Sequence, residues 1–487
     1  MKHRIVNHCI ASAVAAVLLA SAGVRADDPR SRVGTLAFEN ETGVAATIDV
    51  AGPLDLSNPF FQNLGSNGRA CVSCHQPAEG WTVTPSGIRA RFLATGGTDP
   101  IFRTNDGSHS PLADVSTLPA RIAAYDMLLT KGLIRVGIGI PANAEFELVG
   151  VDDPYGYASA AELSLFRRPL PATNLRFLNT VMWDGRETFL DPTSTMCVLG
   201  TSRCYASLHF DLADQSNAAT TGHAQGTQDL STEQRDAIVA FESSLYTAQV
   251  YDRDAGVLDA FGARGGPGPL VDQASYFGIN DVVSGDYRSG ASFDGNVFSL
   301  YGNWDSTETA GNVARESPRA DARMAIARGE KLFNTRVIQI SGVKGLNDDF
   351  NVPVLDGSCS TCHDAPNAGD HSVPMPLNIG VADASRRTPD LPLYTFVCSS
   401  VGVTNGHCTA GQTVQVTDPG RAMITGNFAD IGRFKGPVLR GLAARAPYFH
   451  NGSGADLGAV VDFYDTRFGI GFTAQERSDL VAFLQTL

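Results

Sequence analysis

The chain has 487 residues, of which 43% are apolar and 18% are charged, and its formal net charge is −14. This length and composition are typical of a water-soluble globular protein with two domains or more. The excess of acidic side chains argues against nucleic acid as a partner, because few cations are available to neutralise phosphates. An acidic protein of this kind is suited instead to a basic soluble partner.

Residues 1–26 have the pattern of a secretory signal peptide. Lys2 and Arg4 give it a positive start, residues 9–22 are almost wholly apolar, and small residues precede a cleavage point after Ala26. A membrane anchor is the alternative, but the apolar run is shorter than the ~18–20 residues that span a bilayer. We therefore expect an exported, periplasmic protein with no membrane span.

Two copies of one short motif carry the most information. Residues 71–75 read Cys-Val-Ser-Cys-His, and residues 359–363 read Cys-Ser-Thr-Cys-His. C-x-x-C-H is the attachment motif for c-type haem, in which two thiols bond to one porphyrin and the adjacent imidazole ligates the iron. A thioredoxin-like site would need a βαβ context, and zinc would need another Cys or His pair. The motifs predict two covalently bound haem c groups, held by Cys71, Cys74, His75, Cys359, Cys362 and His363.

The other cysteines, apart from Cys9 in the predicted signal peptide, form two pairs that are close in sequence. These pairs are Cys197 with Cys204 and Cys398 with Cys408. In an oxidising compartment each pair is expected to form a disulfide that closes a short loop. Unpaired thiols are the alternative.

The chain also contains an internal repeat. Residues 231–245 and 473–487 share Arg, Val, Ala, Phe and Leu at matching positions, and each begins with a capping box followed by apolar residues at helical spacing. Because each of these predicted helices follows one haem motif, we expect a mainly α fold of two cytochrome-c-like haem domains with long irregular loops. A further helix is predicted to start at Ser317 with Pro318 in its first turn.

The repeat also gives the expected domain boundaries. An N-terminal haem domain with insertions is predicted for residues 27–250, and a C-terminal haem domain for residues 317–487. Residues 251–316, which are rich in Gly, Asp and Ser, are predicted to connect the two domains.

Three further segments, taken with the haem motifs, resemble the bacterial di-haem cytochrome c peroxidase superfamily, which includes the MauG enzymes. They are Asn58-Pro-Phe-Phe, Arg168-Pro with Trp183-Asp-Gly-Arg, and Phe434-Lys-Gly-Pro with Ala446-Pro-Tyr-Phe-His-Asn-Gly. The order of the motifs matches that of the family, and the resemblance runs over residues 55–487.

In that family the N-terminal haem is peroxidatic and the C-terminal haem transfers electrons. The resemblance implies the same division here, and it gives Trp183 the place of the tryptophan that couples the two haems. A buried core aromatic is the alternative for Trp183. The electrons would come from a small soluble donor, a cytochrome c or a cupredoxin, or from a protein or organic substrate as in the MauG branch.

The sixth coordination position decides the chemistry of each iron, because an iron that meets peroxide needs an open site. His109 is the first histidine after the first motif, in a loop, and we expect that haem to be open. At the second haem, Tyr464 stands where the family has an axial Met, as in the MauG branch, and would lower the reduction potential. An ordinary helix aromatic is the alternative for Tyr464, and Met375 and Met423 are the rival ligands.

Peroxide cleavage also needs a group that moves protons. The family uses a carboxylate or Gln about ten residues after Asp-Leu-x-x-Gln, a pattern that residues 211–215 match. Gln225 lies at the corresponding offset, and His223 beside it is titratable near pH 7. We therefore predict His223 and Gln225 as catalytic residues, with a loop or haem-propionate contact as the alternative for His223. His450 is expected to support a propionate or the region between the haems.

Calcium between the domains is a common feature of the family, and this chain departs from its ligand pattern. Pro169 stands where the family has an Asn, and proline offers no side-chain oxygen. The other ligands map to the backbone carbonyls of Arg445 and Pro447. A substitute oxygen would have to come from Asn105 or Asn174, so calcium is kept as an option.

Together these features predict a periplasmic di-haem oxidoreductase that reduces hydrogen peroxide at the N-terminal haem with electrons relayed through the C-terminal haem. It would act either as a cytochrome c peroxidase or by MauG-like oxidation of a protein or organic substrate. Two alternatives stay open. One is a di-haem electron-transfer cytochrome without enzymatic activity, and the other is an oxygenase that cleaves an organic substrate.

Overall fold

The computed structural model describes residues 34–305 and 318–487. The predicted signal peptide, residues 1–26, lies outside the described residues, as does Ser317, the predicted N-cap of the further helix. Among the described helices, none combines the length and the apolar character that a membrane span requires.

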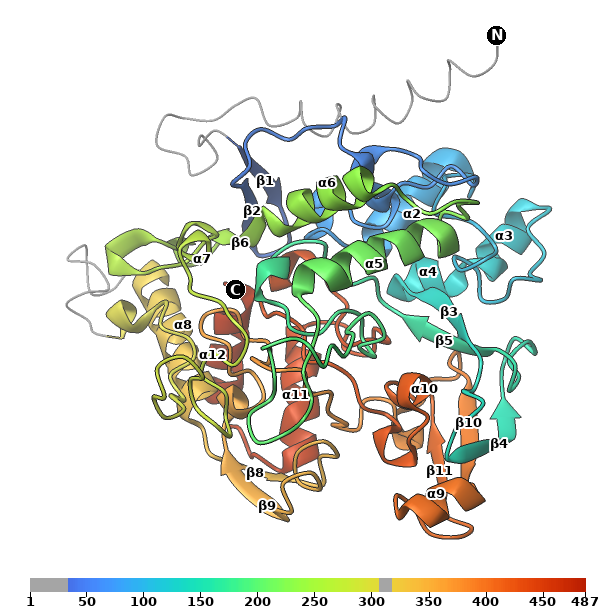
Figure 1. Cartoon of the computed structure of the whole chain (residues 1–487). Coiled ribbons are helices and arrows are strands. Elements are labelled where there is room, and N and C mark those ends of the chain that lie inside the picture. The colour runs from blue at the N-terminus through green and yellow to red at the C-terminus, as the bar shows by residue number, and fades with distance from the viewer. Residues whose placement is uncertain (1–33, 306–317) are drawn as a thin grey trace.

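Helices and short strands alternate along the chain (Figure 1). The α-helices described are α2 (Pro85–Thr95), α3 (Leu118–Ala124), α4 (Asp126–Lys131), α5 (Leu208–Gly222), α6 (Thr232–Ser243), α7 (Gly268–Val271), α8 (Pro318–Thr335), α9 (Ser400–Asn405), α10 (Ala422–Thr425), α11 (Leu457–Phe468) and α12 (Ala474–Gln485). The strands are β1 (Thr35–Glu39), β2 (Gly43–Asp49), β3 (Ile134–Ile138), β4 (Phe146–Asp152), β5 (Leu163–Arg167), β6 (Leu245–Asp252), β7 (Gly256–Val257), β8 (Ile338–Ser341), β9 (Val354–Gly357), β10 (Leu393–Cys398) and β11 (Thr413–Val416).

The strands form several small sheets, so the fold is mixed, and the prediction of a mainly α fold is confirmed only in part. One sheet has the order β1-β2-β6-β7 and another the order β11-β10-β4, and two further pairs are β3-β5 and β8-β9. The sequence signal missed these sheets because most of the strands are short and pair with distant segments. β4 and β10, for example, pair Phe146 with Cys398.

The repeated segments form the helices that the sequence predicts. α6 starts at a capping box between Ser231 and Gln234, and α12 starts at one between Thr473 and Glu476. Each helix buries one apolar face, which includes Phe241 in α6 and a fully buried Phe483 in α12.

α8 and α12 pack against each other at the centre of the C-terminal half (Figure 1). Their core includes Phe333 and Phe483, whose ring centroids lie 5.8 Å apart. Tyr301 and Trp304, from the segment that was predicted to connect two domains, belong to the same core. The described part of that segment therefore packs with both halves, because its strand β7 belongs to the β1-β2-β6-β7 sheet.

Two disulfides join the predicted pairs, Cys197 with Cys204 and Cys398 with Cys408. The second pair lies beside the β11-β10-β4 sheet, at the end of β10 and after α9. The prediction of two short disulfide-closed loops is confirmed.

Candidate haem cavities and the wall between them

The first haem motif forms a short 3₁₀ turn, Cys71–Ser73, which is followed by Cys74 and His75. The backbone N–H of His75 donates to the carbonyl of Cys71 at 3.1 Å. The imidazole Nδ1 lies 3.1 Å from the carbonyl oxygen of Trp81. Burial lowers the pKa of His75 to about 4, so the ring is neutral at pH 7.

The second motif repeats this geometry. Cys359–Thr361 form a 3₁₀ turn, and the backbone N–H of His363 donates to the carbonyl of Cys359 at 3.1 Å. The Nδ1 atom of His363 lies 2.5 Å from the carbonyl oxygen of Gly369. Burial lowers the pKa of His363 to about 4 as well.

Each of these imidazoles is arranged as a metal ligand. When Nδ1 donates to a backbone carbonyl, the tautomer is fixed and the lone pair of Nε2 is free to bind a metal. The four motif cysteines form no disulfide, and burial raises the pKa of Cys359 and Cys362 to about 12. Buried, protonated thiols suit thioether formation better than a thioredoxin-like redox site, which needs a depressed thiol pKa.

Both motifs line large cavities. The first cavity, which contains Cys71, Cys74 and His75 in its wall, encloses about 1550 Å³ of empty space including its open mouth. The second, lined by Cys359, Cys362 and His363, encloses about 1760 Å³ on the same measure. A porphyrin bonded to the cysteines of either motif would therefore lie in the cavity that this motif lines.

Buried cations complete the fit to haem. Arg440 lines the first cavity, and Arg445 and Lys435 line both cavities. In the described structure, Arg440 Nε and Nη1 and Arg445 Nε are buried without a hydrogen-bond partner. Each guanidinium group donates from Nη2 to a backbone carbonyl, but its remaining buried N–H groups are costly to leave unpaired, and the propionate carboxylates of a haem would pair with them. The residues present therefore fit two haem c groups.

Trp183 stands in a wall shared by the two cavities and lines both of them. Its indole N–H donates to the carbonyl of Arg168 at 2.8 Å. Its ring centroid lies 6.3 Å from that of His450, which in turn stacks on Phe434 at 3.9 Å. These side chains give the wall a continuous aromatic layer.

His223 caps the C-terminus of α5 and lines the first cavity. Its Nδ1 lies 2.6 Å from Oδ2 of Asp106, and Asp106 also forms an ion pair with Arg69. Although burial opposes ionisation, Arg69 and His223 hold the pKa of Asp106 below its ordinary value. A charged Asp106 therefore orients the imidazole and leaves Nε2 as its free nitrogen.

Asp106 is the site residue that the sequence reasoning missed. It lies 117 positions before His223, in an irregular loop, so no local spacing links the two. The loop sequence Thr104-Asn-Asp-Gly, next to His109, was the only local signal.

Gln225 and His109 are not part of the lining of the first cavity. Gln225 is exposed, and its Oε1 accepts a hydrogen bond from Asn67 at 3.3 Å. The position of Gln225 therefore gives no support to the predicted catalytic role, whereas Gln215 of α5 does line the cavity. His109 stacks on Tyr155 with ring centroids 4.3 Å apart.

Tyr464, on α11, lines the second cavity, and burial raises the pKa of its hydroxyl above the ordinary value. Met375 lines the same cavity, whereas Met423 is buried in the core beside the β11-β10-β4 sheet. Met423 is therefore not a rival ligand. His371 and His450 also line the second cavity, and each has a buried Nε2 without a hydrogen-bond partner in the described structure.

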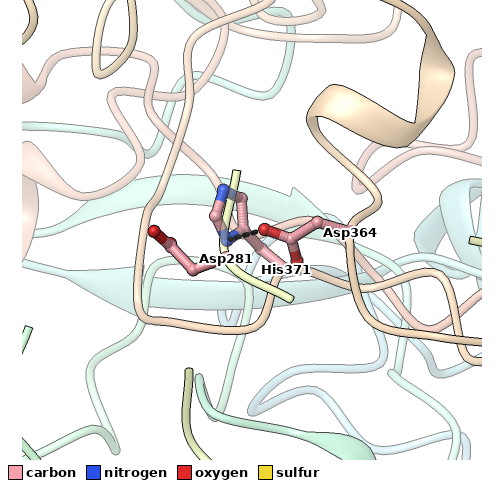
Figure 2. A group of neighbouring side chains, drawn as sticks. All are labelled: Asp281, Asp364 and His371. Carbon is pink, nitrogen blue, oxygen red and sulfur yellow. Dashed lines mark ion pairs between the residues drawn. The ribbon is translucent and has the colours of Figure 1, made fainter. Parts of the chain in front are cut away.

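Asp281, Asp364 and His371 form a buried group next to the second motif (Figure 2). Nδ1 of His371 lies 3.3 Å from Oδ2 of Asp364. The Asp364 carboxylate accepts backbone hydrogen bonds from Ser372 at 2.6 Å and from Val282 at 3.3 Å. These bonds connect the loop that contains Asp281 to the segment that follows His363. They explain why the three side chains lie together without the need for a metal ion.

Several of the oxygens available for calcium already accept hydrogen bonds. The carbonyl of Pro169 accepts a hydrogen bond from Thr82, and that of Arg445 accepts one from Arg168. The side-chain amide of Asn174 forms two hydrogen bonds to the backbone of Thr247, whereas the buried Oδ1 of Asn105 has no hydrogen-bond partner in the described structure and is a single oxygen. Because calcium needs about six to eight oxygen ligands, these residues do not fit a calcium site.

No family model matches the chain. Among curated proteins, the chain is 33% identical over 140 residues to cytochrome-c peroxidase IdrP1 of Pseudomonas sp. (strain SCT), a match that covers 26% of this chain and 36% of the relative. It is 31% identical over 150 residues to cytochrome-c peroxidase IdrP2 of Denitromonas iodatirespirans, which covers 29% and 38% respectively. It is 42% identical over 69 residues to cytochrome c551 peroxidase of Nitrosomonas europaea, which covers 14% and 21%.

The matches thus span little more than a third of the length of the first two relatives. A solved structure, that of a MauG-like protein associated with microbial copper homeostasis, aligns with 96% of this chain and 95% of its own at 17% identity. Its TM-score of 0.33 is too low to carry an argument. Two intact haem motifs, each in the wall of one cavity, together with the partial matches to cytochrome c peroxidases, support the resemblance of the chain to the bacterial di-haem cytochrome c peroxidase/MauG superfamily.

Proposed function

We propose that the protein is a periplasmic di-haem peroxidase-type oxidoreductase that reduces hydrogen peroxide in the first cavity. Cys71, Cys74 and His75 would hold one haem, and the corresponding residues of the second motif would hold the other. When bound, the haems supply the redox chemistry, and two electrons and two protons convert hydrogen peroxide into two waters. The chain itself must bind the reactants, exclude water and move the protons.

The observation that carries this proposal is the His223–Asp106 pair in the wall of the first cavity. With Nδ1 turned to Asp106, the free Nε2 of His223 takes a proton from one peroxide oxygen. The same nitrogen then returns that proton to the departing oxygen, which leaves as water. Asp106 stabilises the imidazolium that forms between these two steps. A carrier of electrons alone has no need of such a pair.

Electrons would reach the first cavity across the shared wall. Trp183 lines both cavities, which supports its assignment as the link between the two haems. Tyr464 is proposed as the sixth ligand of the second haem, because its phenol lines that cavity and an oxygen donor favours oxidised iron. The net charge of −14 favours a basic donor, either a small cytochrome c or a cupredoxin. A protein or organic substrate, as in the MauG branch, is the alternative source.

The proposal is tested with haem-loaded protein, hydrogen peroxide and a reduced small c-type cytochrome as the donor. His223→Ala is expected to lower peroxide turnover by about 10²–10⁴-fold, because it removes the acid–base group. Asp106→Asn, which keeps the imidazole but loses its anionic partner, is expected to lower turnover by about 10–100-fold. His209→Ala is the matched control, since this histidine is on the same helix, with its side chain 61% exposed.

Equal peroxide turnover in wild type and His223→Ala would contradict the acid–base role assigned to His223.

Electron paramagnetic resonance distinguishes a peroxidase from a protein that only carries electrons. A high-spin ferric signal that changes on addition of peroxide supports the enzyme. Two low-spin haems that ignore peroxide, even after partial reduction, would leave only the carrier.

A further inference from the structure

Arg168 is a buried cation in the wall between the two cavities. It follows strand β5, has 5% of its surface exposed and lines both cavities. Its neighbours come from both halves of the chain, so its bonds determine how the halves meet.

Four hydrogen bonds hold Arg168 in this position. Its guanidinium donates from Nη1 to the carbonyl of Lys131 at 3.1 Å and from Nη2 to the carbonyl of Arg445 at 3.0 Å. Its backbone N–H donates to the carbonyl of His450 at 2.6 Å. Its own carbonyl accepts the indole N–H of Trp183 at 2.8 Å. One residue thus ties α4, the tryptophan of the shared wall and the C-terminal half together.

The positively charged guanidinium binds the carbonyl oxygens of Lys131 and Arg445, as a metal cation would. Burial lowers the pKa of Arg168 to about 10, with the Glu79 carboxylate acting against that shift, so the group stays charged at neutral pH. Arg445 and Lys435 line both cavities as well, so the junction already contains three cationic side chains. A divalent ion added there would be repelled by all three.

We propose that the Arg168 guanidinium is the built-in cation that joins the two halves between the cavities, in place of the calcium ion that members of this superfamily often hold. The chain therefore needs no calcium for its stability or its haem content. This inference depends on the arrangement of the junction and not on peroxide turnover. Failure of one proposal would leave the other standing.

The first test measures calcium in the haem-loaded wild-type protein. After exposure to calcium and gel filtration, elemental analysis is expected to find far less than one calcium per chain. The thermal unfolding midpoint and the optical spectrum are expected to be the same with a calcium chelator and with added calcium. One retained calcium per chain, or a midpoint that falls with chelator and recovers with calcium, would overturn the proposal.

The second test removes the cation. Arg467→Ala is the matched control, because Arg467 also donates to backbone carbonyls, those of Ile379 and Ser341, but does not line either cavity. Arg168→Ala is expected to lower the unfolding midpoint by roughly 3–8 °C, more than the control does, because it leaves buried carbonyls without a donor. Arg168→Lys should recover part of the loss. A midpoint unchanged by Arg168→Ala would contradict the assignment, and if that variant fails to fold, the wild-type calcium measurement still decides.

Discussion

The imidazoles of His75 and His363 use the same hydrogen-bonding arrangement, with Nδ1 facing a backbone carbonyl and Nε2 left free. His223 uses a carboxylate instead, that of Asp106. A neutral carbonyl fixes the orientation of a ligand, whereas an anion also stabilises a protonated ring. The anionic partner of His223 therefore supports the proton-transfer role proposed for it.

Tyr464 can be tested as a ligand through the spectrum of the second haem. Tyr464→Phe is expected to keep both covalent haems and to change the absorption and electron paramagnetic resonance signals of only one, because a single iron loses its oxygen donor. Tyr155→Phe is the control, since Tyr155 does not line either cavity. A variant spectrum identical to that of wild type would rule out the ligand assignment.

At the scale of elements, the two repeated helices could be predicted because their signals are local. A capping box lies within four residues, and a buried face repeats every three to four residues along one helix. The β11-β10-β4 sheet carries no comparable signal, since β4 and β10 are separated by more than two hundred residues. Long-range pairing of short strands is decided by tertiary packing.

The N-cap and the buried core residue of α12 should contribute different amounts to the free energy of unfolding. Phe483→Ala is expected to lower the free energy of unfolding by about 3–5 kcal/mol, because the ring is fully buried against Phe298 and Phe333. Thr473→Ala, which removes only the N-cap side chain, is expected to cost about 1 kcal/mol. Denaturant unfolding of the two variants checks the order, which would be contradicted if the cap variant were the less stable.

At the scale of the whole molecule, buried charges hold the two halves together. Arg167 donates to Asp418 from Nε at 2.7 Å and also forms an ion pair with Asp184. Asp184 belongs to the Trp-Asp-Gly-Arg segment, whereas Asp418 comes from the C-terminal half. Like Arg168, this group connects parts of the chain that are distant in sequence.

This ion-pair network predicts a dependence of stability on acid pH. Although burial opposes ionisation of Asp184, Arg167 and Arg186 lower its pKa from 3.8 to about 2. A carboxyl whose pKa is lower in the folded state stabilises the protein above its unfolded pKa, and this stability is lost as protons bind. Wild type should therefore lose about 2 kcal/mol from this group between about pH 4 and about pH 2. Asp184→Asn should show a shallower loss in denaturant unfolding over that range.

The sequence by itself determined the parts of this protein whose signals are short. The haem motifs, the disulfide pairs and the capped helices can each be read within short segments, and the family resemblance can be read from the order of such segments along the chain. The first cavity is different, because His223 meets an aspartate 117 positions away, whereas Gln225, at the family's offset, is exposed and does not line the cavity. The junction proposed for Arg168 also depends on tertiary structure, because only folding brings its guanidinium to the carbonyl of Arg445. Covalent and helical patterns are local, whereas partners for buried charges come from wherever the fold brings the chain together.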